Sequence, residues 1–223
     1  MIRTAAVNII KSRLGNIVGT ELDPVIISNM QLVQATVLER GAELPWFLET
    51  DSNVEGTNIT TTANQEYSDV PSNFLRLNEY IEYPVLRVDS DEDSGYYAVT
   101  QMDISKAIGR YTTDSLLDQA GKPIKYDLYG EKFYWRYIPN DAYTIRLFYF
   151  KSDQTLDMDI ENQWLKYAPD LVIAETCRQT AEDEQLQKLV DKFGMDADKA
   201  RRRILTETVA RREAGAMRTM GDD

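Results

Sequence analysis

The sequence predicts an α+β fold: a split helical bundle from the N- and C-terminal helices, with an inserted antiparallel β-rich domain. Apolar residues recur at helical spacing up to about residue 40 and again beyond about residue 160. Between these segments the apolar pattern alternates and turn residues interrupt it, which is typical of strands. We therefore expect a discontinuous helical bundle of residues 1–43 and 160–214, a β-rich domain of residues 44–159, and a flexible C-terminal tail of residues 215–223.

Two helices are expected in the N-terminal part of the bundle. The second should span residues 24–40, because Asp23 can cap a free backbone N–H and Pro24 fits the first helical position. Gly41 then supplies a left-handed stop. The apolar residues that share one face of the first helix are Val7, Ile10, Leu14 and Ile17.

The central region predicts short strands and then an aromatic meander. The meander consists of residues 124–129, 132–137 and 143–151, and its two connections contain Gly130 and Pro139. Turn residues at these places favour antiparallel pairing of successive strands. The other expected segments are strands at 46–49, 58–62, 74–77, 85–88 and 96–100, a short helix at 102–111, and a polar loop or weak hairpin at 50–65.

Helical periodicity returns at about Glu161 and, after a break or first turn at Pro169, continues over residues 171–182. An apolar seam follows, and its steps of three or four positions predict a helix–helix contact. Gly194 lies inside this seam and leaves open a break in the last helix. The seam residues are Leu186, Val190, Phe193, Ala197, Ala200 and Ile204.

The composition excludes several classes of enzyme. The chain has no His, which removes Ser-His-Asp and Cys-His catalysis and most zinc sites. Its one cysteine, Cys177, cannot form an internal disulfide and is expected to be a buried small hydrophobe in a protein of a reducing compartment. Neither a glycine-rich phosphate loop nor an apolar run long enough to cross a bilayer occurs in the sequence.

An acidic run resembles the opening of a calcium-binding loop. The run contains Asp89, Asp91 and Asp93, whose carboxylates stand at alternate positions. The match then fails, because Ser94 replaces the required Gly and Thr100 replaces the bidentate Glu. A solvated acidic turn between two strands is the favoured interpretation, with a calcium site as the alternative.

Aromatic residues gather in the meander, where residues 124–151 hold ten of the chain's 22. In a strand, Phe133, Trp135 and Tyr137 share one face, while Tyr134 lies on the other. Both faces of this strand are therefore expected to be partly buried. The second face can pack on a neighbouring element of the same chain, on another subunit, or on a sugar.

Charge is segregated along the chain. The sequence has 25 Lys and Arg against 37 Asp and Glu, a net charge of −12, yet residues 199–218 hold seven basic and two acidic residues, a local +5. Some of these charges can pair along the helix surface, as Glu207 and Arg211 do at a spacing of four. Three consecutive arginines at 201–203 cannot all find carboxylates on their own helix, so a docking surface for an acidic partner is the equal alternative. Nucleic acid fits less well, because the acidic remainder repels phosphate.

Several short motifs occur in an order that is similar to a known family. Arg40-Gly41 leads to PWFL at residues 45–48, and VPSNFLR follows at 70–76. GKP at 121–123 precedes the meander with its YIP at 137–139, and PDL and AEDE then stand at 169–171 and 181–184. This order resembles the head-to-tail adaptor proteins of tailed bacteriophages, the connector or tail-tubular adaptor group, over nearly the whole chain.

The resemblance implies a structural virion protein with no common enzymatic activity. Members form a ring, usually of twelve copies, beneath the portal protein in the phage neck, where the ring extends the channel used in genome ejection. The helical bundle makes the ring contacts, and a downstream tail or nozzle protein binds below. The resemblance implies assembly in the host cytoplasm. The acidity of this chain suits a channel through which DNA passes without specific binding.

In this family the C-terminal segment reaches the portal, which makes its basic and methionine side chains the candidate contacts. Arginine forms charge-assisted hydrogen bonds to carboxylates, and methionine adapts to irregular apolar grooves. The candidate portal-binding residues are Arg201, Arg202, Arg203, Arg211, Arg212, Met217, Arg218 and Met220. No catalytic residue, metal, cofactor or membrane contact is expected. Two alternatives stay open: a carboxylate-dependent cell-wall glycan hydrolase and a generic glycan-binding module.

Overall fold

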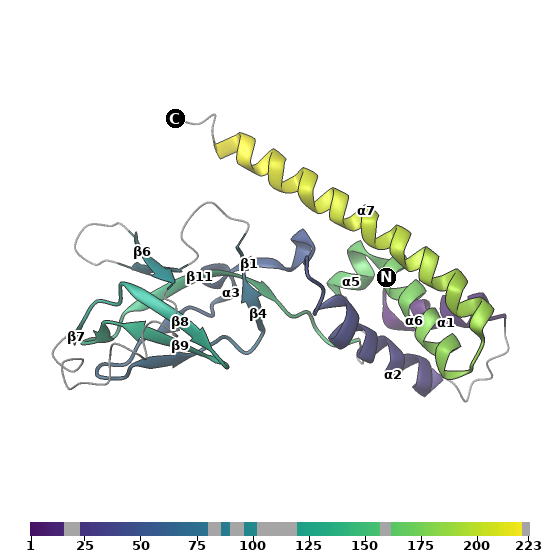
Figure 1. Ribbon diagram of the computed structural model, residues 1–223, viewed down its shortest axis with the longest axis horizontal. Coiled ribbons are helices and arrows are strands. Elements are labelled where there is room, and N and C mark those ends of the chain that lie inside the picture. Colours follow the sequence, from purple (N-terminus) through teal and green to yellow (C-terminus); the bar gives the residue numbers. More distant parts are fainter. Residues whose placement is uncertain (16–22, 80–85, 90–95, 102–119, 157–161, 220–223) are drawn as a thin grey trace. The chain divides into compact units, whose positions relative to one another are not determined.

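The fold is described from a computed structural model. The structure describes residues 1–15, 23–79, 86–89, 96–101, 120–156 and 162–219. It confirms the α+β class and divides the chain into a helical unit, Met1–Leu48 with Ser152–Asp223, and a β unit, Glu49–Lys151 (Figure 1). The divisions thus fall after residues 48 and 151, where the sequence predicted them after 43 and 159.

The helical unit is built from both ends of the chain. Its α-helices are α1 (Arg3–Arg13), α2 (Asp23–Val33), α5 (Gln163–Tyr167), α6 (Pro169–Asp183) and α7 (Gln187–Thr219). Two shorter helical turns join them, a π-helical turn η2 (Gln34–Leu38) and a 3₁₀ turn η3 (Trp46–Leu48).

Helix α6 is the centre of this unit, because α1, α2, α5 and α7 all pack against it. Its residues from Leu171 to Cys177 are consequently all buried. Helix α7 covers α6 with the C-terminal part of the predicted seam, in which Phe193, Ala197, Ala200 and Ile204 are buried. Gly194 does not break α7, which runs unbroken to Thr219. The backbone of residues 215–219 is therefore helical, although the sequence predicted a flexible tail from residue 215.

The end of α2 differs from the expected helix over residues 24–40. The chain widens into the π turn η2, whose amide N–H of Glu39 donates to the carbonyl of Gln34 at 3.0 Å. Gln34 is buried, and its side chain donates to Glu39 Oε1 at 2.7 Å and accepts from the amide of Leu156 at 3.1 Å. This tertiary contact explains the wide turn. Gly41 does not adopt a left-handed conformation, so the predicted stop is wrong.

Within the described residues, the strands of the β unit form one nine-stranded sheet and one two-stranded sheet. The large sheet has the strand order β1-β11-β5-β6-β8-β9-β3, and β2 and β4 also pair with β11. Of the strands that the structure describes, four pair with the long strand β11 (Thr144–Lys151), all of them antiparallel. The other elements are β1 (Glu49–Asp51), α3 (Ser52–Glu55), β2 (Ile59–Thr60), β3 (Tyr67–Asp69), β4 (Phe74–Leu77), β5 (Leu86–Asp89), β6 (Tyr96–Gln101), β7 (Ala120–Gly121), β8 (Lys125–Tyr129), β9 (Lys132–Arg136) and β10 (Ile138–Pro139).

The predicted three-stranded meander is only partly correct. Strands β8 and β9 form the expected hairpin, with Gly130 at a φ of 62° in its turn. Strand β11 does not continue the hairpin, because β3 occupies the free edge of β9 and β10 pairs with β7. Strands β6 and β8 pair in parallel, so the sheet is mixed rather than purely antiparallel.

Some of the shorter predicted elements also change. Residues 46–48 form the turn η3, so the strand expected at 46–49 begins only at Glu49. The polar segment 50–65 contains α3 and the strand β2, which pairs with β11 instead of forming a hairpin. The strand at 74–77 is confirmed. The helix expected at 102–111 lies outside the described residues.

Aromatic rings fill the core of the β unit. Phe133 and Trp135 of β9 are fully buried, and Trp135 Nε1 donates to Ser68 Oγ at 3.0 Å. On the opposite face of β9, Tyr134 is half-buried and its ring lies 6.0 Å from that of Tyr67. Tyr137, predicted to share the buried face, is 37% exposed. Tyr67 is the residue of the adjacent strand β3 directly opposite Tyr134, so these two rings lie side by side on the second face of the sheet.

Candidate partner-binding site

Most of the predicted contact residues lie on α7, and the structure gives several of them a partner inside the helical unit. Arg201 Nη2 lies 2.6 Å from Glu175 Oε1, and Arg178 Nε lies 2.9 Å from the other oxygen of the same carboxylate. The Glu175 side chain is only 5% exposed. A carboxylate so deeply buried requires cationic partners, so Arg201 joins α7 to α6.

Arg203 and Arg211 also make intramolecular ion pairs. Arg203 lies 3.3 Å from Asp170 at the start of α6, and both side chains are more than half exposed. Arg211 pairs with Glu207 at 2.8 Å, as its spacing predicted, and its guanidinium stacks 3.8 Å from the centre of the Trp46 ring. These contacts hold α7 against α6 and the turn η3.

Arg212 makes another contact with the N-terminal part of the helical unit. Its Nη2 donates to the carbonyl oxygen of Leu44 at 3.2 Å. One turn earlier, Thr208 Oγ1 accepts from the amide of Trp46 at 3.4 Å. The segment before η3 is therefore tied to α7 at two successive turns of the helix.

Arg202 differs from its two neighbours. It is exposed, and it makes no ion pair with any residue in the part of the chain that the structure describes. Met195 and Val209 lie seven positions before and after it and are 69% and 47% exposed. Because residues seven apart share a face of a helix, these three form one outward stripe. We call Met195, Arg202 and Val209 the outer stripe of α7.

Sequence reasoning missed this division among the arginines. The sequence correctly predicted that the three arginines at 201–203 could not all pair with carboxylates of α7 itself. It did not predict that α6 supplies Glu175 to Arg201 and Asp170 to Arg203. The heptad spacing of the outer stripe was present in the sequence and could have identified it. Met217 and Arg218 belong to the helical backbone of α7, and Met220 lies outside the described residues.

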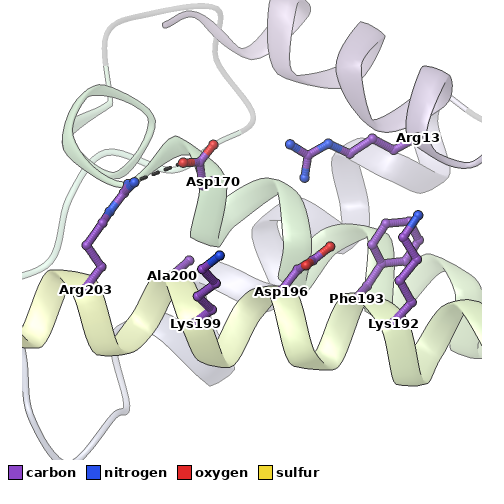
Figure 2. A pocket seen from close by; sticks show the side chains of 8 residues that line it. All are labelled: Arg13, Asp170, Lys192, Phe193, Asp196, Lys199, Ala200 and Arg203. Carbon is purple, nitrogen blue, oxygen red and sulfur yellow. Dashed lines mark hydrogen bonds and ion pairs between the residues drawn. The ribbon is translucent and has the colours of Figure 1, made fainter.

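A hollow of about 590 Å³ opens where α7 passes α1 and the start of α6. Figure 2 shows Arg13 entering it from α1, opposite the α7 side chains, with Arg203 and Asp170 paired at one end. Its lining contains four cationic and two acidic side chains. We call it the basic hollow; it is lined by Arg13, Asp170, Lys192, Phe193, Asp196, Lys199, Ala200 and Arg203.

A search with known family models matches residues 10–220 of the chain to the SU10 adaptor protein family. This is a phage head–tail adaptor family, and the match extends over both units and includes all of α7. The chain belongs to the SU10 adaptor family. No curated protein matches it.

Membership makes this adaptor chain a structural component of a phage virion that associates with other head and tail proteins. No helix within the described ranges is long and apolar enough to cross a membrane. No group of His, Cys, Asp and Glu that could hold a metal ion occurs among these residues. Asp89 ends β5, which pairs with β6, whereas Asp91 and Asp93 of the acidic run lie outside them.

The titration of Cys177 argues against a nucleophilic role for its thiol. The side chain is fully buried, and this burial raises the pKa of Cys177 to about 12. Since the thiolate is the reactive species, the side chain is inert near neutral pH. It packs in the core of α6, as the sequence predicted for a small hydrophobe.

Proposed function

We propose that this SU10 adaptor forms a ring beneath the portal protein in the neck of a tailed phage, where it joins the capsid to the tail. The family assignment establishes a phage adaptor. The proposal adds where in the virion this adaptor lies and that the portal protein is its partner. The observation that carries it is the form of α7. This helix is fastened to the rest of its unit by arginines, and its backbone continues to Thr219, seven residues beyond Arg212, the last of those with a described side-chain contact.

The described contacts between α7 and the rest of its unit stop before the end of the helix. Among the described side chains, the last hydrogen bond from α7 to another element is that from Arg212 to Leu44. The helix continues to Thr219, and Figure 1 shows its end running beyond α5 and α6 of the same unit. A helix end without tertiary support is stabilised mainly by what it binds, because isolated short helices are marginal in water. This end is therefore the part of the adaptor that we assign to the portal.

The geometry changes which predicted residues we assign to portal contact. Arg201, Arg203 and Arg211 already neutralise carboxylates of this chain, so their side chains contribute little free charge to a partner. The exposed cation of the outer stripe, Arg202, and the methionines and Arg218 of the last residues are the better candidates. An acidic and partly apolar portal surface would complement them.

The remaining features of the proposed role are those that the resemblance to phage adaptors implies for such a ring. We infer about twelve copies, assembly in the host cytoplasm, a tail or nozzle protein bound below, and passage of DNA during genome ejection. The charge of −12 per copy opposes tight binding of phosphate, so DNA can move through without specific contacts. None of these tasks requires catalysis, and we infer a role without an enzymatic reaction.

Electron microscopy of the purified adaptor mixed with candidate portal rings tests this proposal. We expect an additional ring of density on one face of the portal, at stoichiometric occupancy. Loss of turbidity of a peptidoglycan suspension serves as the matched assay for hydrolysis. Absence of decorated rings together with loss of turbidity would overturn the proposal in favour of a hydrolase.

A further inference from the structure

The basic hollow holds more cations than it can pair. Arg203 has Asp170 as its partner at 3.3 Å. Among the residues that the structure describes, Arg13, Lys192 and Lys199 have no ion-pair partner, and Asp196 is the one other carboxylate in the lining. Three cations facing one carboxylate create a positive potential in a concave site, where converging charges concentrate the field.

The three cations come from two helices whose backbones are held in one unit. Arg13 is at the last turn of α1, while Lys192 and Lys199 lie two turns apart on α7, with Asp196 between them (Figure 2). Phe193 and Ala200, next to these lysines, are buried in the seam with α6, which fixes the face that α7 presents. The packing of α7 on α6 therefore places both lysines on the side of the helix that faces the hollow, where their exposed ammonium groups lie near Arg13.

The same unit carries an excess of negative charge at another place. Glu182, Asp183 and Glu184 follow one another at the end of α6, and all three are exposed. Carboxylates at a helix C-terminus are unfavourable, because the helix dipole is negative there, and α6 has no basic residue in its last turn. We call these three residues the acidic turn.

Local contacts neutralise the acidic turn only in part. Glu182 lies 3.9 Å from Arg178, a cation that already serves the buried Glu175. Asp183 accepts from the amide groups of Asn29 at 2.8 Å and Gln179 at 3.1 Å, neither of which carries a charge. Glu184 makes no ion pair with any residue of the described segments. The turn thus retains charge that a cationic surface can bind.

We propose that the basic hollow of one copy binds the acidic turn of a second copy. The inference rests on the proposed ring and names one of its contacts. Both features lie on one compact unit and do not pair with each other within the chain, so the complementary partner is the same unit of another molecule. A contact between two different surfaces of identical subunits is heterologous, and repetition of such a contact closes a ring when the rotation permits.

The contact should be weak in free protein and sensitive to salt. Each copy carries −12, so neighbouring copies repel one another except where this local attraction acts. Thiol cross-linking is suited to such a contact, because it traps a transient encounter. The natural thiol does not interfere, since Cys177 is fully buried.

A two-chain cross-linking experiment tests the contact directly. One variant carries Lys199→Cys and the other Glu184→Cys, and the two are mixed under mild oxidation. We expect disulfide-linked dimers in roughly tenfold excess over a control mixture of Lys199→Cys with Glu213→Cys, because a specific contact raises the local concentration of the thiols. Glu213 is an exposed glutamate on α7 of the same unit. Equal yields in the two mixtures would overturn the proposal.

Charge reversal distinguishes a specific contact from general attraction. Lys192→Glu with Lys199→Glu reverses two charges of the hollow, and Glu182→Lys with Glu184→Lys reverses two charges of the turn. On portal rings, each double variant alone should lose occupancy, and an equal mixture should recover part of it because the reversed surfaces match in alternating copies. Circular dichroism of each variant checks that the helices are retained. Loss without recovery in the mixture would overturn the proposal.

The two tests separate this inference from the proposed function. Ring formation on the portal without the selective cross-link would leave the adaptor role intact and remove the hollow as a subunit contact. A selective cross-link without portal decoration would support the contact and overturn the position beneath the portal.

Discussion

The helical unit and the β unit of this adaptor differ in what they bury. At the contact between α6 and α7, a carboxylate that is almost inaccessible to solvent, Glu175, is neutralised by two arginines. In the β unit, the ring of Phe133 lies within 6 Å of those of Phe74, Tyr126 and Trp135. Removing an aromatic ring leaves a cavity, whereas removing an arginine leaves a buried charge. The two units should therefore respond differently to substitution and to pH.

The largest effect is expected from Trp135→Ala in the β unit. The side chain is fully buried and its Nε1 bonds to Ser68, so truncation leaves a cavity and an unpaired hydroxyl. We expect a loss of about 3–5 kcal/mol in the free energy of unfolding of this unit, measured by urea titration. Tyr129→Ala on the same hairpin is the control, because that side chain is 67% exposed and should cost about 0.5 kcal/mol or less. Equal losses would contradict an aromatic core centred on Trp135.

In the helical unit, two adjacent arginines of α7 can be compared, one with a buried partner and one exposed. Arg201→Met removes a partner of buried Glu175 and should lower the free energy of unfolding by about 1–2 kcal/mol, a value reduced by the 42% exposure of Arg201. Arg202→Met should change stability by less than about 0.5 kcal/mol, since Arg202 is exposed. For portal binding we expect the reverse order: Arg202→Met should reduce binding more than Arg201→Met does. Thermal unfolding and decoration of portal rings measure the two properties.

Glu55 should make the stability of the β unit depend on pH in the acid range. The hydrogen bond from Lys151, at 2.7 Å, lowers the pKa of Glu55 below its ordinary value of 4.5. A lowered folded-state pKa adds stability above pH 4.5, and this stability disappears as the pH falls through the folded-state value. Glu55→Gln should therefore be less stable than the parent at neutral pH and should approach it in acid. A difference that is independent of pH in urea titrations would contradict this assignment.

Glu39 in the helical unit should show the opposite dependence of stability on pH. Its burial raises the pKa of Glu39 above 4.5, despite hydrogen bonds from Gln34 and the amide of Asp153. A raised folded-state pKa adds stability below pH 4.5, which disappears as the pH rises through the folded-state value. Glu39→Gln keeps an acceptor oxygen without the buried charge, so we expect it to equal or slightly exceed the parent in stability at neutral pH. Marked destabilisation there would show that the ionised carboxylate is required.

The smallest change in stability is expected from deletion of residues 214–223. This deletion removes helix beyond the contact between Arg212 and Leu44, so the midpoint of thermal unfolding should stay nearly unchanged. Attachment to portal rings should be strongly weakened, because the end of α7 beyond Arg212 is lost. Rings decorated at parental occupancy would instead assign the portal contact to the rest of the helical unit.

The partners that the α7 arginines have within the chain could be predicted from the sequence only in part. Spacing along one helix identified the pair of Glu207 and Arg211, since residues four apart always share a face. It could not identify the partners of Arg201 and Arg203, which lie 26 and 33 positions away on α6. The basic hollow was missed for the same reason, because Arg13 and Lys199 are distant in sequence and meet only in the folded unit.

The sequence by itself determined the class of fold, the long C-terminal helix and its seam, the hairpin of β8 and β9, and membership of an adaptor family. These follow from periodicity, turn residues and motif order, all of which act over short distances along the chain. Only the tertiary structure decided that β3 rather than β11 pairs with β9 and that α2 ends in a π turn around Gln34. It also decided which arginines neutralise the carboxylates of α6 and which one faces outward. Such choices depend on long-range contacts, whose energies no local pattern in the sequence records.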